Sequence, residues 1–217
     1  MSTYLNHAYY THQPYLKEII VNTSGNILEC GCGDGSTLFI RDCIKNTNRT
    51  LVSLESDIKW LSKFVYLQND NHKLFYVDAN NVDCNDTGKR WYDYISENLK
   101  DYNFEVVFID SSPWLSRKYS YEYFKNKAKI IIIHDFDYFP VNNIIGKVTK
   151  TNWYNNKRID EVDLSDEIKN YKLYYPPLEY FVGATGPPTL ICSNILSTDE
   201  FNKIINIVDN NVDKYYK

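Results

Sequence analysis

The sequence predicts an α/β fold in which a mostly parallel sheet of about seven strands carries helices on both faces. Three observations lead to this prediction. Short β-branched runs alternate with longer segments whose apolar residues recur at helical spacing, and such alternation forms right-handed βαβ units. A glycine-rich turn follows the first of these runs directly. No repeat or linker divides the 217 residues into separate domains.

Each predicted element follows from its own residue pattern. The runs expected to be strands cover residues 26–28, 50–54, 73–77, 104–109, 129–134 and 189–193. The segments with helical spacing cover residues 13–21, 35–46, 57–68, 88–99 and 115–127. Ser197 and Glu200 form a capping box ahead of a last helix, and a further helix is expected near residues 164–170.

Composition and charge restrict the class of protein. A hydrophobic fraction of 43% supplies a sizeable core, so we expect one domain over residues 1–217. A net charge of −4 provides no broad basic field, which argues against a nucleic-acid partner. The longest apolar run, residues 130–133, is too short to cross a membrane, and the N-terminus has no apolar signal segment. We therefore expect a soluble, cytoplasmic protein without a membrane partner.

The most informative motif is NILECGCGDGSTLFI, residues 26–40. A buried strand ends at Glu29, a turn with Gly31, Gly33 and Gly35 follows, and then a helix begins. Glycines let a ligand lie directly on the backbone, and the helix N-terminus behind them offers free N–H groups. A dinucleotide site requires G-x-G-x-x-G, whereas the third glycine comes one residue early here.

This G-x-G-x-G turn after an acidic residue resembles motif I of the class I S-adenosylmethionine (SAM)-dependent methyltransferases. The resemblance covers roughly residues 15–140 and implies a Rossmann-like methyltransferase fold that binds SAM. It places Glu29 near the methionine amino group. It also implies that Gly31, Gly33 and Gly35 pack on the methionine and ribose portions of SAM.

The ends of the next two predicted strands extend the resemblance. Glu55 ends the second strand, twenty residues after Gly35. A carboxylate at that position can accept the ribose hydroxyl protons, which is its role in the family. The third strand is followed by Asp78 and Ala79, for which the resemblance implies a place beside the adenine.

Carboxylates also follow the fourth and fifth predicted strands, namely Asp110, Asp135 and Asp137. The carboxyl ends of parallel strands share one edge of a sheet, so these side chains could converge in one cleft. Three carboxylates there would repel each other unless a cation or a proton joined them, and oxygen ligands suit Mg²⁺. The alternative is that Asp110 and Asp135 only cap helices or contact SAM directly.

This arrangement resembles the metal-dependent O-methyltransferases of the catechol and macrocin types, and the string I-I-H-D is especially similar to the macrocin group. The resemblance implies Mg²⁺-assisted O-methylation of a small hydroxylated acceptor such as a sugar. It makes Asp110, His134 and Asp135 the candidate catalytic residues and Asp110, Asp135 and Asp137 the candidate metal ligands. His134 is the candidate base that removes the acceptor proton.

The loop after the fourth predicted strand supports a rival interpretation. Ser111-Ser112-Pro113 stands where the macrocin type often has Gly-x-His, and Phe136 replaces the Asn of the catechol type. The segment from Ser111 to Trp114 matches loosely the Pro-Pro-aromatic motif of methyltransferases that modify nitrogen in nucleic acids or proteins. A non-catalytic SAM-binding module is a further alternative, as is a NAD or nucleotide-sugar enzyme, which the glycine spacing disfavours.

Two regions are expected to complete the site. Residues 1–25 are predicted to form an N-terminal helix and lid, with Tyr4 and His7 as candidates for the SAM pocket. Residues 138–188 are predicted to form a variable, aromatic cap on the acceptor side, or equally a cover for the edge of the sheet. His12 has no predicted role, and a homodimer is a candidate assembly.

Overall fold

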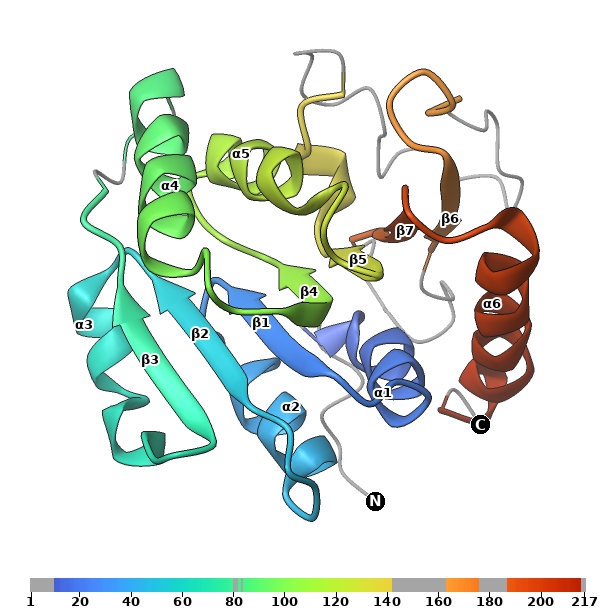
Figure 1. Ribbon diagram of the computed structural model, residues 1–217, viewed down its shortest axis with the longest axis horizontal. Coiled ribbons are helices and arrows are strands. Elements are labelled where there is room, and N and C mark those ends of the chain that lie inside the picture. The colour runs from blue at the N-terminus through green and yellow to red at the C-terminus, as the bar shows by residue number, and fades with distance from the viewer. Residues whose placement is uncertain (1–9, 80–81, 83, 142–162, 176–186, 216–217) are drawn as a thin grey trace, which may run out of the picture.

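The computed structural model contains one seven-stranded sheet with helices on both faces (Figure 1). It describes residues 10–79, 82, 84–141, 163–175 and 187–215. The strand order is β3-β2-β1-β4-β5-β7-β6; β7 runs antiparallel to β5 and to β6, and the other neighbouring strands are parallel. The first five strands follow the order of a doubly wound nucleotide-binding sheet, in which the winding direction reverses between β1 and β4.

The strands are short, and most of the helices lie between them in the chain. The strands are β1 (Asn26–Cys30), β2 (Leu51–Glu55), β3 (His72–Tyr76), β4 (Phe104–Ile109), β5 (Ile130–Ile133), β6 (Asn170–Tyr174) and β7 (Thr189–Ser193). The α-helices are α1 (Gln13–Val21), α2 (Thr37–Ile44), α3 (Ile58–Ser62), α4 (Asn85–Asn98), α5 (Trp114–Phe124) and α6 (Thr198–Val212). Short 3₁₀ turns are η3 (Val65–Leu67), η4 (Phe136–Tyr138) and η7 (Asp213–Tyr215). No helix in these described ranges combines the length and apolar character that a membrane crossing needs.

The central strands bury side chains on both faces. In β4, Val107 and Ile109 join the core beneath α4 and α5, whereas Val106 and Phe108 join the core that α1, α2 and α6 cover. Burial of alternate residues on opposite faces produces the continuous apolar runs of a parallel sheet. The sheet therefore holds its carboxyl ends rigidly between two layers of helices.

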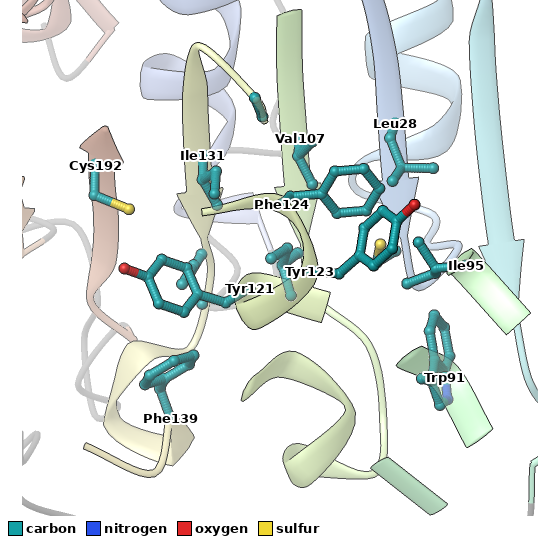
Figure 2. Close-up of a cluster of buried hydrophobic side chains, with 14 of the residues drawn as sticks. Leu28, Trp91, Ile95, Val107, Tyr121, Tyr123, Phe124, Ile131, Phe139 and Cys192 are labelled. Carbon is teal, nitrogen blue, oxygen red and sulfur yellow. The ribbon is translucent and has the colours of Figure 1, made fainter. Parts of the chain in front are cut away.

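The core beneath α4 and α5 is rich in aromatic residues (Figure 2). Trp91 of α4 and Phe124 of α5 are buried in it together with Leu28 of β1. Gly88 lets α4 approach α5 closely, because a Cβ atom at this position would lie 2.2 Å from Cδ2 of Tyr119. The two helices are thereby fixed against each other on this face.

The turn after β1 passes directly against the end of β4. Gly31 has a φ angle of 95°, and a Cβ atom there would lie 2.6 Å from the carbonyl oxygen of Asp110. Only glycine combines this left-handed backbone with so close an approach. Gly31 thus brings the glycine loop and the loop after β4 together at the reversal of the sheet.

The predicted elements agree with the structure except in the last third of the chain. The doubly wound sheet, the helices between strands and the capping box of Ser197 and Glu200 are confirmed. The helix expected near residues 164–170 is wrong, because a turn there leads into β6, which pairs with β7. Pairing along the whole of β7 compensates for the weak local strand signal of residues 170–174.

Candidate active site

A cavity of about 620 Å³ opens at the carboxyl ends of β1, β2, β4 and β5. Its wall includes Gly33 and Gly35 after β1, Glu55 at the end of β2, Asp110 after β4 and His134 after β5. Open α/β sheets hold their ligands at this edge, beside the point where the winding reverses. The sheet therefore gathers most of the predicted site residues around one space.

The glycine loop is held in place from both sides. The side-chain amide of Gln13 in α1 donates a hydrogen bond to the carbonyl oxygen of Gly35 over 2.7 Å. The backbone N–H of Gly33 donates to the hydroxyl of Thr37, over 2.9 Å, in the first turn of α2. The loop thus presents a fixed backbone to the cavity beside the N-terminus of α2, where N–H groups favour a negative or polar ligand atom.

Glu29 supports this loop from below and does not line the cavity. Its carboxylate is fully buried and accepts hydrogen bonds from the hydroxyls of Thr37, over 3.0 Å, and Ser53, over 2.6 Å. Burial, opposed by these hydrogen bonds, raises the pKa of Glu29 to about 7. Glu29 therefore reaches the loop through Thr37, and its place beside the methionine amino group stays a prediction.

Glu55 lies in the cavity wall, as its predicted role requires. One carboxylate oxygen accepts the backbone N–H of Cys32 over 3.0 Å, and the other accepts those of Ser56 and Asp57 over 2.7 and 2.8 Å. Burial nevertheless raises the pKa of Glu55 above its ordinary value. A carboxylate has about four acceptor positions, so Glu55 retains one for a ligand hydroxyl.

Asp78 and Ala79 are not part of the cavity wall. Asp78 is exposed just beyond the end of β3, and Ala79 is buried in the core with α4 and α5. On the side of β2, the wall instead includes Asp57 and Trp60. The indole N–H of Trp60 donates to the carbonyl of Cys32 over 2.6 Å, which fixes this ring against the glycine loop.

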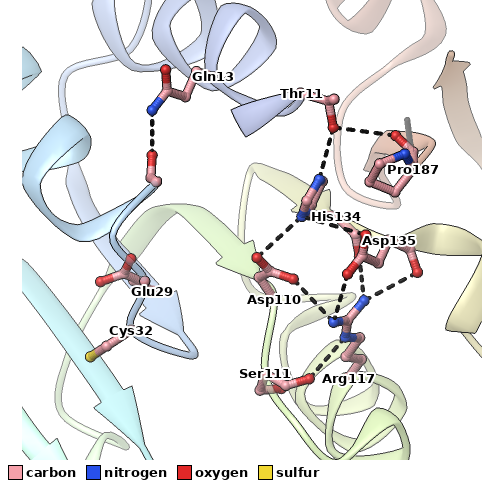
Figure 3. A network of polar contacts seen from close by, with 12 residues as sticks. Thr11, Gln13, Glu29, Cys32, Asp110, Ser111, Arg117, His134, Asp135 and Pro187 are labelled. Atoms are coloured by element: carbon pink, nitrogen blue, oxygen red, sulfur yellow. Dashed lines mark hydrogen bonds and ion pairs between the residues drawn. The ribbon is translucent and has the colours of Figure 1, made fainter. Parts of the chain in front are cut away.

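Asp110, His134 and Asp135 meet at the other end of the cavity (Figure 3). Nδ1 of His134 lies 3.1 Å from Oδ2 of Asp110 and 3.9 Å from Oδ1 of Asp135. Nε2 of His134 lies 3.0 Å from the hydroxyl of Thr11, which donates to the carbonyl of Pro187 over 3.4 Å. The ring is thus held from both nitrogens, by carboxylates on one side and a hydroxyl on the other.

This network favours the protonated form of His134. Burial by itself lowers the pKa of His134, but the carboxylates of Asp110 and Asp135 outweigh it and leave the pKa above its ordinary value. An imidazolium can donate to Asp110 and to Thr11 at once, which leaves the Thr11 proton for Pro187. Each donor in the chain from Asp110 through His134 and Thr11 to Pro187 then has an acceptor.

The segment before α1 also reaches the cavity. His12 and Tyr10 lie in the wall, and the ring of His12 packs edge-on against His134 with centroids 4.4 Å apart. Burial, reinforced by the neighbouring His134, lowers the pKa of His12 to about 3, so this ring is neutral. The candidates Tyr4 and His7 lie outside the described residues, as do residues 142–162 and 176–186 of the predicted cap.

Arg117 of α5 occupies the position between the two carboxylates where a metal was expected. Its Nη2 lies 3.0 Å from Oδ1 of Asp110 and 3.4 Å from Oδ2 of Asp135. Asp137 is buried within η4 and does not line the cavity. Asp110, Asp135 and Asp137 therefore do not form one open set of ligands among the described residues, and a Mg²⁺ site there stays a prediction.

The loop from Ser111 to Trp114 gives little support to the nitrogen-methylating alternative. Of these four residues only Ser112 lies in the cavity wall. The ring of Trp114 stacks on Tyr138 with centroids 4.4 Å apart and an interplanar angle of 19°. Tyr138 therefore covers one face of Trp114, and the ring, which is 39% exposed, does not line the cavity.

Comparison with solved structures identifies the fold. An O-methyltransferase from Bacillus cereus, solved in complex with SAH, aligns with a TM-score of 0.53 at 15% identity, over 85% of this chain and 81% of that chain. A protein described as a caffeoyl-CoA O-methyltransferase from Staphylococcus aureus aligns with a TM-score of 0.51 at 14% identity, over 85% of this chain and 83% of that chain. This chain has the methyltransferase fold. No protein-family model matches the sequence, and no curated protein matches it.

Within this methyltransferase fold, the sequence left several site residues unidentified. These residues come from helices or from the segments before them and not from the loops that carry the motifs: Arg117 from α5, Gln13 from α1, and Tyr10 and His12 from the segment before α1. One feature of the sequence could have identified Arg117: it is a basic residue in the helix that follows the acidic end of β4. His12 had none, because a lone histidine before a helix has no specific pattern.

Proposed function

We propose that this chain is a SAM-dependent methyltransferase that acts on a hydroxyl group of a small acceptor such as a sugar. The observation that carries the proposal is a single cavity with two different ends. One end has the glycine loop and Glu55, and the other has Asp110, His134 and Asp135. Group transfer requires a bound donor and an activated acceptor side by side, which this arrangement supplies.

The cofactor end suits SAM in size and chemistry. The cavity volume of about 620 Å³ lies within the range of about 300–1,000 Å³ typical of small-molecule sites. The exposed backbone of Gly33 and Gly35 allows close approach of a ligand, and Glu55 keeps one acceptor position for a ribose hydroxyl. These features support SAM better than a dinucleotide, whose pyrophosphate prefers the longer glycine spacing.

The acceptor end suits the removal of a proton. Bound SAM supplies a methyl group on a sulfonium, and the attacking acceptor oxygen must lose its proton. The hydroxyl of Thr11 lies 3.0 Å from Nε2 of His134, so the acceptor hydroxyl must take the place of Thr11 to reach this nitrogen at hydrogen-bond distance. Asp110 orients the ring through Nδ1 and stabilises the imidazolium that forms. We propose His134 as the base, with Asp110 as the group that positions it.

Calorimetric titration with SAM and S-adenosylhomocysteine tests the cofactor assignment. We expect micromolar binding to the wild-type chain and a loss of binding in Gly33→Val, which adds bulk on the loop. Asp78→Asn serves as the control, because this exposed carboxylate lies outside the cavity wall and should leave affinity unchanged. Absence of binding to the wild type would overturn the proposal, and weaker binding by Asp78→Asn would restore the sequence-based adenine assignment.

Transfer of a radiolabelled methyl group to sugars and catechols tests the acceptor assignment. Only neutral His134 can accept a proton, so turnover should rise with pH around a midpoint above the ordinary histidine pKa. His134→Gln and Asp110→Asn should lose turnover about 10²-fold or more while keeping SAM affinity. Tight SAM binding without turnover on any acceptor would instead indicate a non-catalytic binding module.

A further inference from the structure

We propose that the guanidinium of Arg117 is the resident cation of the acceptor end, and that it holds Asp110 and Asp135 together in place of a divalent metal. The carboxylates at the ends of β4 and β5 need a positive charge between them. A side chain of α5 supplies that charge from within the fold. The consequence for methyl transfer rests on the function proposed above, whereas the cation assignment stands on the contacts alone.

The side chain of Arg117 is buried and fully hydrogen-bonded in this position. Its side chain is 4% exposed, and all five of its N–H groups have acceptors. Nε donates to the carbonyl of Ser111 over 2.8 Å, and Nη1 donates to those of His134 and Asp135 over 2.7 and 3.1 Å. Nη2 donates to the two carboxylates. A guanidinium that is saturated with hydrogen bonds on two loops is a fixed part of the site.

Both carboxylates of the site already have partners on each of their oxygens. Each of the two carboxylates has one oxygen toward Arg117 and the other toward His134. The guanidinium therefore lies against both carboxylates at once, in the place between them that a metal ion would take. A divalent cation placed between the carboxylates would meet the guanidinium at close range, where repulsion is strong.

Arg117 also holds Asp135 in an unusual backbone conformation. Asp135 has φ and ψ angles of 48° and 48°, in the left-handed region that few residues other than glycine adopt. Arg117 binds both the carbonyl oxygen and the carboxylate of this residue. Arg117 is therefore a positioning residue for the acceptor end.

One competing arrangement would contradict this assignment. Among the described residues, His12, Asp110 and His134 offer ligand atoms that lie within 4.8 Å of one another. Both ring nitrogens of His12 are buried, and neither has a side-chain partner in the part of the chain that the structure describes. A metal ion bound by these three residues would take the place of a proton on His134. That metal ion, and not Arg117, would then be the main cation of the acceptor end. The experiment must therefore distinguish metal binding at His12 from metal binding between the carboxylates.

Titration with Mn²⁺, followed by electron paramagnetic resonance, tests the proposal without reference to methyl transfer. We expect no specific binding to the wild type. Arg117→Met removes the charge but keeps an apolar stem, and it should gain Mn²⁺ affinity by about tenfold or more over the matched control Arg117→Lys, which keeps the charge. Asp135→Asn in the Arg117→Met background should abolish the gain.

Three results would overturn the proposal. The first is stoichiometric Mn²⁺ binding by the wild type that His12→Phe abolishes. The second is wild-type binding that Asp110→Asn and Asp135→Asn both weaken. The third is equal Mn²⁺ affinity in folded Arg117→Met and Arg117→Lys. If Arg117→Met does not fold, the wild-type titration with its three single variants decides the question alone.

Discussion

Glu29→Gln offers a quantitative test of how the glycine loop is supported. Glu29 has an ordinary pKa of 4.5 and a pKa of about 7 in the folded chain, because it is buried beneath the loop. Between these two values the folded state binds more protons than the unfolded state, so stability falls as pH rises. The contribution is fully present below about pH 4.5 and is lost as pH rises through about 7.

The size of this effect follows from the two pKa values. At about 1.4 kcal/mol per pH unit, the interval from 4.5 to about 7 corresponds to about 3 kcal/mol of unfolding free energy. About 2 kcal/mol of it falls between pH 5 and pH 8. The amide that Glu29→Gln introduces would not ionise, so the variant should gain about that much stability relative to the wild type over the same range.

Urea denaturation at pH 5 and pH 8, followed by tryptophan fluorescence, measures this difference. Glu105→Gln is a control of opposite sign, because Lys129 and the N–H groups of Ser24 and Gly25 outweigh burial and lower the pKa of Glu105. The contribution of Glu105 is already present above its ordinary pKa, so the stability of this variant relative to the wild type should stay nearly constant between pH 5 and pH 8. A stability difference for Glu29→Gln that stays constant with pH would refute the account of Glu29 as a buried, proton-binding support.

Two further predictions concern packing and the acceptor end. Gly88→Ala should lower the unfolding free energy by about 1–3 kcal/mol in urea denaturation, because the added methyl group overlaps the ring of Tyr119. An unchanged or higher stability would show that α4 and α5 can separate without penalty. Thr11→Val should lower the pKa of His134, followed by NMR of the ring protons, because the imidazolium loses its acceptor at Nε2. An unchanged pKa would mean that Thr11 does not accept from a protonated ring.

The glycine motif shows which site residues can be predicted from local sequence. The turn with Gly31, Gly33 and Gly35 was found from its spacing, and the acid at the end of β2 from its distance to that turn. Both features lie at ends of strands, where position in the chain fixes position on the sheet. Glu29 was assigned to the same cavity, yet its side chain points beneath the loop. Neighbouring residues at the end of a strand point to opposite faces, and the motif does not say which face the ligand occupies.

The acceptor end illustrates the opposite case. The sequence indicated that Asp110 and Asp135 would converge and would need a cation. The sequence suggested a metal ion for this role and did not identify Arg117. Arg117 lies in α5, and only the packing of α5 on the sheet places its side chain against the two carboxylates. The missed strand β6 has the same cause, since it is defined by its pairing with β7, a strand that comes later in the chain.

The sequence by itself determined the doubly wound sheet, the position of the cofactor loop and the acids at the carboxyl ends of the strands. These features depend on periodicity and on short-range spacing, which the chain carries locally. The tertiary structure alone decided which side chain lies between the two carboxylates, which partners the ring nitrogens of His134 have and which acid supports the glycine loop. Burial and contacts between distant segments set these properties, because the electrostatic free energy of a charge depends on everything packed around it.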